Sequence, residues 1–413
     1  MTNSEINKTP KGFVSGKQSF KYNLSRRDDL VACLDKPLVN WAERLGRFAF
    51  LPYAIDDVFV QGYEHFPLRT DEAPVIAIAH KKLSDVFAAL TFMAGRPIER
   101  FHDITLVAQA GLFYGIYSYR DLVPTFLKRQ PMIPLLAGLS RLSGHLTKQF
   151  VHSLHANPVF REGVDLPSEL DYYDRRFAGE YIMKMNYDEF VRHAGRTTAS
   201  SVVTAQKELI QMNRAFVIFP EGKYCHDGAI AEMQDLVGVV SYRKSRPIIS
   251  ASLTYDELCQ DKFGRTTGWV KIMPPVQPPR SKAEIPKTLH ELRQTLQENS
   301  IVTASHLIAT TLQKFRNREK PTFEWQEFLD RYNRSVSAAI ESGFSFDVRL
   351  KEQSFRDRQL GRFMRRKGKR WLLKNKRKFS FREDELAQFA STERTVDDLV
   401  WNANNIRHLK LLK

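Results

Sequence analysis

The chain has 413 residues, of which 42% are hydrophobic, and it carries a formal net charge of +16. This length allows one large domain with appendages or two domains, and the apolar content is enough for a sizeable core. No run of 18 apolar residues occurs, which argues against a membrane-spanning helix, and the polar N-terminus lacks the apolar core of a signal peptide. The excess of cations favours polyanionic partners: nucleic acid, an anionic membrane or phosphorylated substrates.

The first part of the chain changes from polar to α/β in character. Residues 1–27 are expected to be loosely attached, and residues 35–55 to form a short amphipathic helix followed by an apolar stretch. Helices are then predicted over 84–94, with Ser84 as the N-cap, and over 197–214. Apolar runs rich in β-branched residues predict strands at 75–79, 103–109, 157–161, 215–222, 246–256 and 268–276. Strands that alternate with helices indicate an α/β fold.

After a proline-rich break at 274–280 the pattern changes again. Residues 281–342 are predicted to be helical, and a strongly basic segment follows. From Arg362 to Lys378, 10 of 17 residues are basic and none is acidic, which leaves 16 − 10 = +6 for the rest of the chain. Interleaved Phe, Leu and Trp residues predict a basic amphipathic helix suited to an anionic membrane surface.

The residues expected to contact the membrane are Arg365, Arg366, Lys369, Arg370 and Trp371. Two other interpretations of this segment stay open. It could be a solvated helix, or it could bind nucleic acid. No nucleic-acid recognition fold surrounds the segment, so we expect no nucleic-acid partner.

The stretch APVIAIAHKKLSD, residues 73–85, ends a predicted strand in a histidine and an aspartate five positions apart. On one continuous helix, residues with this spacing would point away from each other. His80 is instead expected in the turn after the strand, and Asp85 in the first turn of the next helix, so the two side chains can meet. A carboxylate on one ring nitrogen leaves the other able to accept a proton. A pair that only ties down a loop is the alternative.

A second strand, in FVIFPEGKYCHDG (216–228), also runs into a sharp turn. Gly222 allows the backbone to approach a ligand closely, and Lys223 supplies charge for a phosphate. By itself this pattern is also consistent with an ordinary turn. The three cysteines, Cys33, Cys225 and Cys259, show no disulfide or metal spacing and are expected to be free thiols.

The ordered set of motifs resembles the glycerolipid acyltransferase family, the group around 1-acyl-glycerol-3-phosphate acyltransferase. The set is VQGYEHFP (60–67), H-x-x-x-x-D (His80 to Asp85), FPEG (219–222) and RPIISASL (246–253), and it covers roughly residues 57–280. The resemblance implies a central mixed β-sheet flanked by helices, with an N-terminal amphipathic helix and a C-terminal helical, basic extension. The implied boundaries are 1–56 for the tail and helix, 57–280 for the catalytic domain, 281–355 for a helical region and 356–413 for the basic segment.

The same resemblance implies a direct transfer of an acyl group from a thioester to a hydroxyl. His80 would be the general base and Asp85 would orient it. The residues implied in acceptor binding are Arg161, Pro220, Glu221, Gly222 and Lys223, with Arg161 as a ligand of the acceptor's phosphate. The co-substrate would be acyl-CoA or acyl carrier protein. No further cofactor and no metal are expected, and Cys225 is expected to be a buried spectator.

Departures from the family pattern leave the acceptor open. Ala79 stands where the family usually has asparagine, and the FPEG block continues with Lys223 and Tyr224 rather than Thr-Arg. Lys81 and Lys82 could share phosphate recognition, although solvated surface lysines are the simpler expectation. Residues 298–312 faintly resemble the helical region of glycerol-3-phosphate acyltransferases.

The expected function is acylation of 1-acyl-glycerol-3-phosphate (lysophosphatidic acid) by a peripheral enzyme at the cytoplasmic face of a membrane. Alternatives are glycerol-3-phosphate or another lysolipid as the acceptor, or a non-catalytic lipid-binding protein on the same fold. Deletion of residues 361–413 is expected to spare acyl transfer.

Overall fold

In the computed structural model, the described residues are 10, 12–26, 29, 31, 55–81, 85–109, 155–160, 166, 168–169, 172, 185–222, 225–388 and 394–409. The amphipathic helix predicted before residue 55 lies outside this part of the chain. So do the predicted site residues Arg161 and Lys223, as well as Lys82, Ser84 and Tyr224.

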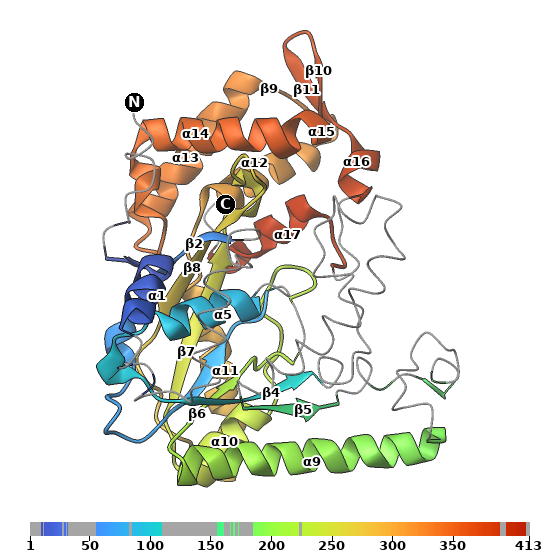
Figure 1. Cartoon of the computed structure of the whole chain (residues 1–413). Helices are drawn as coiled ribbons and strands as arrows, with labels where there is room; N and C mark the ends of the chain where they lie inside the picture. Colours follow the sequence, from blue (N-terminus) through green and yellow to red (C-terminus); the bar gives the residue numbers. More distant parts are fainter. Residues whose placement is uncertain are drawn as a thin grey trace.

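The described chain is organised around an eight-stranded sheet with the order β1-β2-β8-β7-β3-β6-β4-β5 (Figure 1). Its strands are β1 (Val14–Ser15), β2 (Ile55–Gln61), β3 (Val75–Ile78), β4 (Ile104–Gln109), β5 (Ala156–Val159), β6 (Ala215–Ile218), β7 (Ile248–Tyr255) and β8 (Thr266–Ile272). Strands β7, β3, β6, β4 and β5 are mutually parallel, β8 is antiparallel to β7, and β1 is antiparallel to β2. The predicted mixed α/β architecture is therefore confirmed.

The central strands form because their residues are apolar on both faces. Every residue of β3, β6 and β7 is buried, as expected for parallel strands that are covered on both sides. The helices of this part are α1 (Gly16–Ser25), α5 (Asp85–Ala94), α9 (Tyr187–Gln211), α10 (Leu236–Lys244) and α11 (Ile285–Glu298). Helix α9 begins ten residues before its predicted start, because Asn186 and Glu189 form a capping box.

Residues 14–25 are not loosely attached, and the expectation for this part of the N-terminus is wrong. Strand β1 pairs with β2, and the hydroxyl of Ser15 caps α1 while donating to Asp57 Oδ2 at 2.6 Å. The amide of Asn23 donates to the carbonyl oxygens of Ala94 and Arg96, both at 2.7 Å. These bonds join the N-terminal helix to the end of α5.

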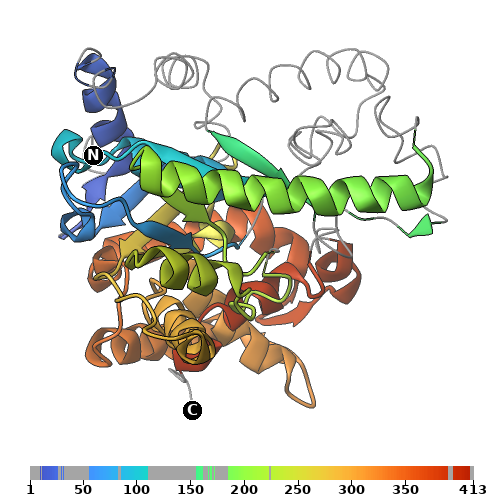
Figure 2. The same ribbon diagram turned by 90° about the horizontal axis from the view of Figure 1, so that it is seen from below.

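A second hydrophobic core lies beyond the sheet, and the C-terminal elements gather on one side of the molecule (Figure 2). Its helices are α12 (Ala304–Arg316), α13 (Trp325–Glu341), α14 (Gln353–Phe363), the short α15 (Lys369–Trp371), α16 (Glu383–Gln388) and α17 (Asp398–Asn404). A three-stranded sheet joins them, with the order β10-β11-β9 and the strands β9 (Thr322–Glu324), β10 (Leu372–Asn375) and β11 (Lys378–Phe381). Helices α11, α12 and α13 confirm most of the helical stretch predicted over 281–342, which strand β9 interrupts.

The basic segment is not one amphipathic helix, and that prediction is wrong. Helix α14 passes through a π-helical turn at Met364–Gly368 into α15, and the chain then turns back as the β10–β11 hairpin. Trp371 is 1% exposed in the second core. We therefore correct Trp371 from a membrane-contacting residue to a core residue, because its ring is already buried.

Of the four cations predicted to contact the membrane, two have partners in the protein and the other two are exposed. The guanidinium of Arg366 donates to the carbonyl oxygens of Asp261, at 2.9 Å, and Lys262. Arg370 lies 3.7 Å from Glu385. Arg365 and Lys369 are exposed. No helix in the described part of the chain has both the length and the apolar character needed to cross a membrane.

Candidate active site

The structure brings His80 and Asp85 together at the carboxyl edge of the sheet. Ala79 still bonds to β7, and the chain turns away from the sheet at His80 before α5 starts at Asp85. His80 Nδ1 lies 3.1 Å from Asp85 Oδ2. The contact predicted from the five-residue spacing is therefore present, and it lies where α/β sheets place their sites.

Asp85 is completely buried and is held by three groups. Its Oδ1 accepts a hydrogen bond from the Tyr255 hydroxyl at 2.6 Å, and its Oδ2 also accepts from the backbone N–H of Lys81. This carboxylate favours the His80 tautomer with the proton on Nδ1, and Nε2 then carries the lone pair that a base needs. The ring of Phe219 stacks on the imidazole with 4.3 Å between centroids.

Tyr255 was not identified as a site residue from the sequence. It is the last residue of β7, the strand that pairs with β3, so its side chain meets the turn that follows β3. One sequence signal could have identified Tyr255 as a site residue. It is a polar aromatic residue at the carboxyl end of a predicted buried strand, and the turn with His80 also follows a predicted buried strand.

Tyr255→Phe is expected to slow a reaction in which His80 acts as a base about tenfold, while leaving the protein folded. The variant removes a hydrogen bond to a buried carboxylate, a bond of the kind worth about 1.5–3 kcal/mol, and leaves Asp85 less firmly oriented. Steady-state kinetics measure the effect. Tyr63→Phe is the matched control, because that buried hydroxyl donates at 2.8 Å to the carbonyl of Phe92, away from the dyad. Equal losses of activity in both variants would contradict the role of Tyr255.

Glu221 holds the backbone of the proposed base. Its Oε1 accepts the N–H of His80 at 3.1 Å, while Oε2 is buried with no hydrogen-bond partner among the described residues. Gly222 adopts a left-handed conformation with φ +66°, and its N–H closes a turn onto Phe219 O at 3.1 Å, while Pro220 O accepts from Gln234 N at 2.7 Å. The FPEG turn therefore fixes a carboxyl group directly behind His80.

Burial raises the pKa of Glu221 to about 7, against a smaller lowering by its bond to the His80 N–H and by the charge of Lys81. Between pH 4.5 and about 7 the unfolded chain releases a proton that the folded chain keeps. This carboxyl group therefore makes the folded state less stable as the pH rises through that window, by roughly 3 kcal/mol in total.

Glu221→Gln removes this pH dependence, since glutamine resembles the protonated glutamate at every pH. We expect the variant to match the wild type near pH 4.5 and to be more stable by roughly 3 kcal/mol at about pH 8. Urea unfolding across this range measures the difference. Glu232→Gln, at an exposed glutamate in the following loop, is the matched control. If the free energies of unfolding of Glu221→Gln and the wild type differed by the same amount at all pH values, the raised pKa of Glu221 would be contradicted.

Lys81 is not a solvated surface lysine, and that expectation is wrong. The residue is 3% exposed, and its ammonium group donates to the carbonyl oxygen of Gly228 at 3.4 Å. The backbone N–H of Lys81 bonds to Asp85, and its charge acts on Glu221. Lys81 therefore connects the dyad to the loop that follows the FPEG turn.

The loop over residues 225–230 lies between the dyad and the C-terminal helix α17. Cys225 N donates to His80 O at 2.9 Å, and the indole N–H of Trp401 donates to Cys225 O at 2.8 Å. Asn404 bonds to the carbonyl of Asp227 at 2.9 Å. A Cβ on Gly228 would lie 2.1 Å from Trp401 O, so only glycine permits this approach. The C-terminal segment thus supports the site from behind.

Cys225 itself behaves as the sequence suggested. It is 1% exposed, and burial raises the pKa of its thiol to about 12, so the group is uncharged at neutral pH. A protonated buried thiol is a poor nucleophile. Among the described residues, no group of three or more His, Cys, Asp or Glu residues is arranged to hold a metal ion.

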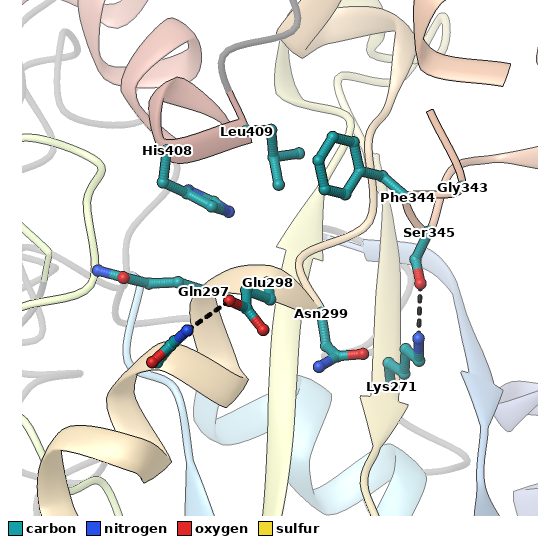
Figure 3. Close-up of a pocket in the computed structure, with 10 residues that line it drawn as sticks. Lys271, Gln297, Glu298, Asn299, Gly343, Phe344, Ser345, His408 and Leu409 are labelled. Carbon is teal, nitrogen blue, oxygen red and sulfur yellow. Dashed lines mark hydrogen bonds between the residues drawn. The ribbon is translucent and has the colours of Figure 1, made fainter. Parts of the chain in front are cut away.

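A separate cavity of about 470 Å³ lies between the end of α11 and residues 408–409 (Figure 3). Lys271 and Ser345 line one side and are joined at 2.6 Å, and the His408 ring extends toward the space between them and α11. Neither His80 nor Asp85 lines this cavity. It is therefore distinct from the proposed catalytic position.

Comparison with known proteins gives a distant structural likeness. No protein-family model matches the chain, and no curated protein matches it in sequence. Among solved structures, it is similar to the 1-acyl-sn-glycerophosphate (LPA) acyltransferase PlsC from Thermotoga maritima. The alignment covers 68% of this chain and 94% of that chain, with 15% identity and a TM-score of 0.36. A likeness this distant assigns no function to the chain.

Proposed function

We propose that this protein transfers a fatty acyl group from an acyl thioester to the free hydroxyl of 1-acyl-glycerol-3-phosphate. The observation that carries the proposal is the 3.1 Å contact between His80 Nδ1 and the buried carboxylate of Asp85. This carboxylate is itself fixed by Tyr255 and by the Lys81 backbone. A base oriented by a fixed carboxylate is well suited to abstract a proton from a hydroxyl.

In the proposed reaction, His80 Nε2 takes the proton of the acceptor hydroxyl as its oxygen attacks the thioester carbonyl. A C–O bond forms, the C–S bond breaks, and the proton on His80 passes to the departing thiolate. The thioester is carried by CoA or by acyl carrier protein, and no other cofactor takes part. Asp85 stabilises the imidazolium that forms in between.

We further propose that the acceptor binds beside the FPEG turn. Pro220 and Gly222 shape this turn next to His80, and Glu221 holds the His80 backbone rather than presenting an exposed carboxylate. Recognition of the acceptor's phosphate is assigned to Arg161 and Lys223. The acceptor and the product are lipids, so we propose that the enzyme works at the cytoplasmic face of a membrane.

The test is an acyl-transfer assay with purified protein and labelled acyl-CoA or acyl carrier protein. The acceptors are lysophosphatidic acid, glycerol-3-phosphate and a neutral lysolipid, and His80→Ala is the reference. Activity with lysophosphatidic acid that disappears in His80→Ala supports the proposal. If the protein prefers glycerol-3-phosphate or the neutral lysolipid, the proposed acceptor is wrong and the proposed acyl-transfer reaction stands. If no acceptor is acylated with either donor, the proposal that the protein is an acyltransferase is wrong, and lipid binding without catalysis becomes the function to test.

A further inference from the structure

Residues 372–381 form a β-hairpin, here called the basic hairpin, that projects from the body of the molecule (Figure 1). In the register of β10 and β11, Asn375 lies opposite Lys378, which leaves Lys376 and Arg377 as a two-residue turn. The hairpin is thus narrow, and its turn lies at the end farthest from the second core.

The base of the basic hairpin is fixed by aromatic packing. Phe379 lies 5.7 Å from Phe323 and 5.6 Å from Trp325 between ring centroids, and Phe381 lies 5.8 Å from Phe323. Strand β9 adds a third strand to the sheet. An isolated two-stranded hairpin is marginally stable in water, and this one is supported by a core, so its turn is held in a defined position.

The far end of the hairpin is exposed and strongly basic. Residues 373–378 are all exposed and include no acidic residue, while Glu324 of β9 lies opposite Lys378. Leu373 is 48% exposed and lies on the face of the strand that points away from the core. The cations at this end of the hairpin are Lys374, Lys376, Arg377 and Lys378.

The turn places a charged residue in a backbone conformation that is unfavourable for it. Lys376 adopts φ 53°, a left-handed conformation that two-residue hairpin turns usually give to glycine or asparagine. A lysine there is less favourable than glycine by conformation alone. Lysine on an edge strand also discourages aggregation, but this purpose does not require a lysine in the turn itself.

We propose that the basic hairpin binds the surface of an anionic lipid bilayer, with its cations at the head groups and Leu373 entering the interface. The choice of a bilayer over nucleic acid rests on two observations and on the lipid substrate of the proposed function. The exposed apolar side chain is aliphatic, and the aromatic rings of the hairpin pack inward, where they are unavailable to stack on bases. Lys378 lies on the same face of the hairpin as Leu373, and Lys376 and Arg377 form the turn beside it, so cations and an exposed leucine together match an anionic interface.

The expected strength follows from the charge. Each lysine or arginine near an anionic leaflet strengthens binding by about fivefold. Replacing all four cations by glutamine should therefore weaken binding by roughly two orders of magnitude or more. The effect should shrink as salt is added, because the Debye length falls to about 3 Å at 1 M ionic strength.

The experiment measures co-sedimentation of the full-length protein with vesicles of phosphatidylcholine alone or mixed with phosphatidylglycerol. The quadruple variant Lys374→Gln, Lys376→Gln, Arg377→Gln and Lys378→Gln is compared with a control of equal net charge. The control replaces exposed cations near α10 and the start of α11, far from the hairpin (Figure 1): Arg243→Gln, Arg280→Gln, Lys282→Gln and Lys287→Gln. We expect the hairpin variant alone to lose binding to the anionic vesicles.

Two smaller variants keep the proposal falsifiable if the quadruple variant folds poorly. Lys376→Gly with Arg377→Gln suits the turn geometry and should fold at least as well as the wild type, yet bind more weakly. Leu373→Ser should weaken binding severalfold while leaving the charge unchanged. Thermal unfolding checks the fold of each variant.

Several outcomes would overturn the proposal. They are equal loss of vesicle binding in the hairpin and control variants, unchanged binding in the hairpin variant, and loss of binding to an RNA or DNA oligonucleotide without loss of vesicle binding. Acyl transfer to lysophosphatidic acid, glycerol-3-phosphate and a neutral lysolipid, each supplied without vesicles, is measured in parallel on every variant. Vesicle binding that depends on the hairpin in a protein without transferase activity would leave this proposal standing and remove the proposed function.

Discussion

Replacing His80 with alanine is expected to lower kcat of acyl transfer by about 10²–10⁴-fold, with little change in KM. The imidazole is proposed to act only as the acceptor loses its proton, so its removal raises the barrier of the chemical step without weakening substrate binding. The residue is 8% exposed and lies at the end of a strand, so a small side chain leaves the sheet intact. Initial rates over a range of acceptor concentrations measure the effect.

Asp85→Asn tests whether the carboxylate acts through the histidine. An amide can still accept the Tyr255 hydrogen bond, but its NH₂ group would face the His80 ring nitrogen and the Lys81 N–H. The imidazole would then favour the tautomer with its lone pair on Nδ1, turned away from the acceptor. We expect a smaller but still large loss of kcat. Wild-type rates in His80→Ala or Asp85→Asn, with folding confirmed by circular dichroism, would refute the dyad.

Trp401→Ala is expected to destabilise the protein by about 3–5 kcal/mol and to reduce acyl transfer beyond what the remaining folded fraction explains. The indole is 1% exposed, lies beneath the guanidinium of Arg394 at 4.0 Å, and donates to Cys225 O. Removing it leaves a cavity and frees the loop that is bonded to His80 O. Urea unfolding and kcat, both measured at a temperature where the variant is folded, give the two effects.

Trp325→Ala is the control, because Trp325 packs against the second core and contacts Phe328 and Phe379 rather than the 225–230 loop. It should lower stability while leaving kcat of the folded protein unchanged. Trp401→Phe should retain most of the packing and lose the hydrogen bond to Cys225 O.

The contacts of Trp401 with the 225–230 loop argue against the expectation that residues 361–413 can be deleted without loss of acyl transfer. If a truncated protein were as active as the full chain, the supporting role of α17 would be wrong.

The sheet and the dyad were predictable because short-range patterns determine them. Continuous apolar runs identified β3, β6 and β7, and a histidine and an aspartate on either side of a strand-to-helix turn implied a contact that is now seen at 3.1 Å. Strands β1 and β2 were missed. Strand β1 has two residues, and β2 is interrupted by Asp56 and Asp57, of which Asp57 accepts from Ser15 and Lys17 of the N-terminal segment.

The rest of the site depends on contacts between distant segments. Tyr255 reaches Asp85 across 170 residues, and Trp401 reaches Cys225 across 176. No local pattern encodes such pairs. The basic segment was misjudged for a related reason: interleaved Lys, Phe and Leu residues suit an amphipathic helix and also a hairpin whose aromatic side packs on a core. The hairpin is stabilised because β9 pairs with β11 and Phe323 packs on Phe379, and both contacts come from some fifty residues earlier in the chain.

The position of Trp401 behind the 225–230 loop has a consequence for how the protein is made. The loop leaves the ribosome 176 residues before the tryptophan that holds it. At about 5–20 residues per second, this gap corresponds to roughly 10 to 35 seconds of synthesis. During that interval the histidine and the aspartate already exist, but the loop beside them lacks its support. Under the proposed function, a nascent chain would therefore react with thioesters more slowly than the finished protein until α17 has emerged and docked.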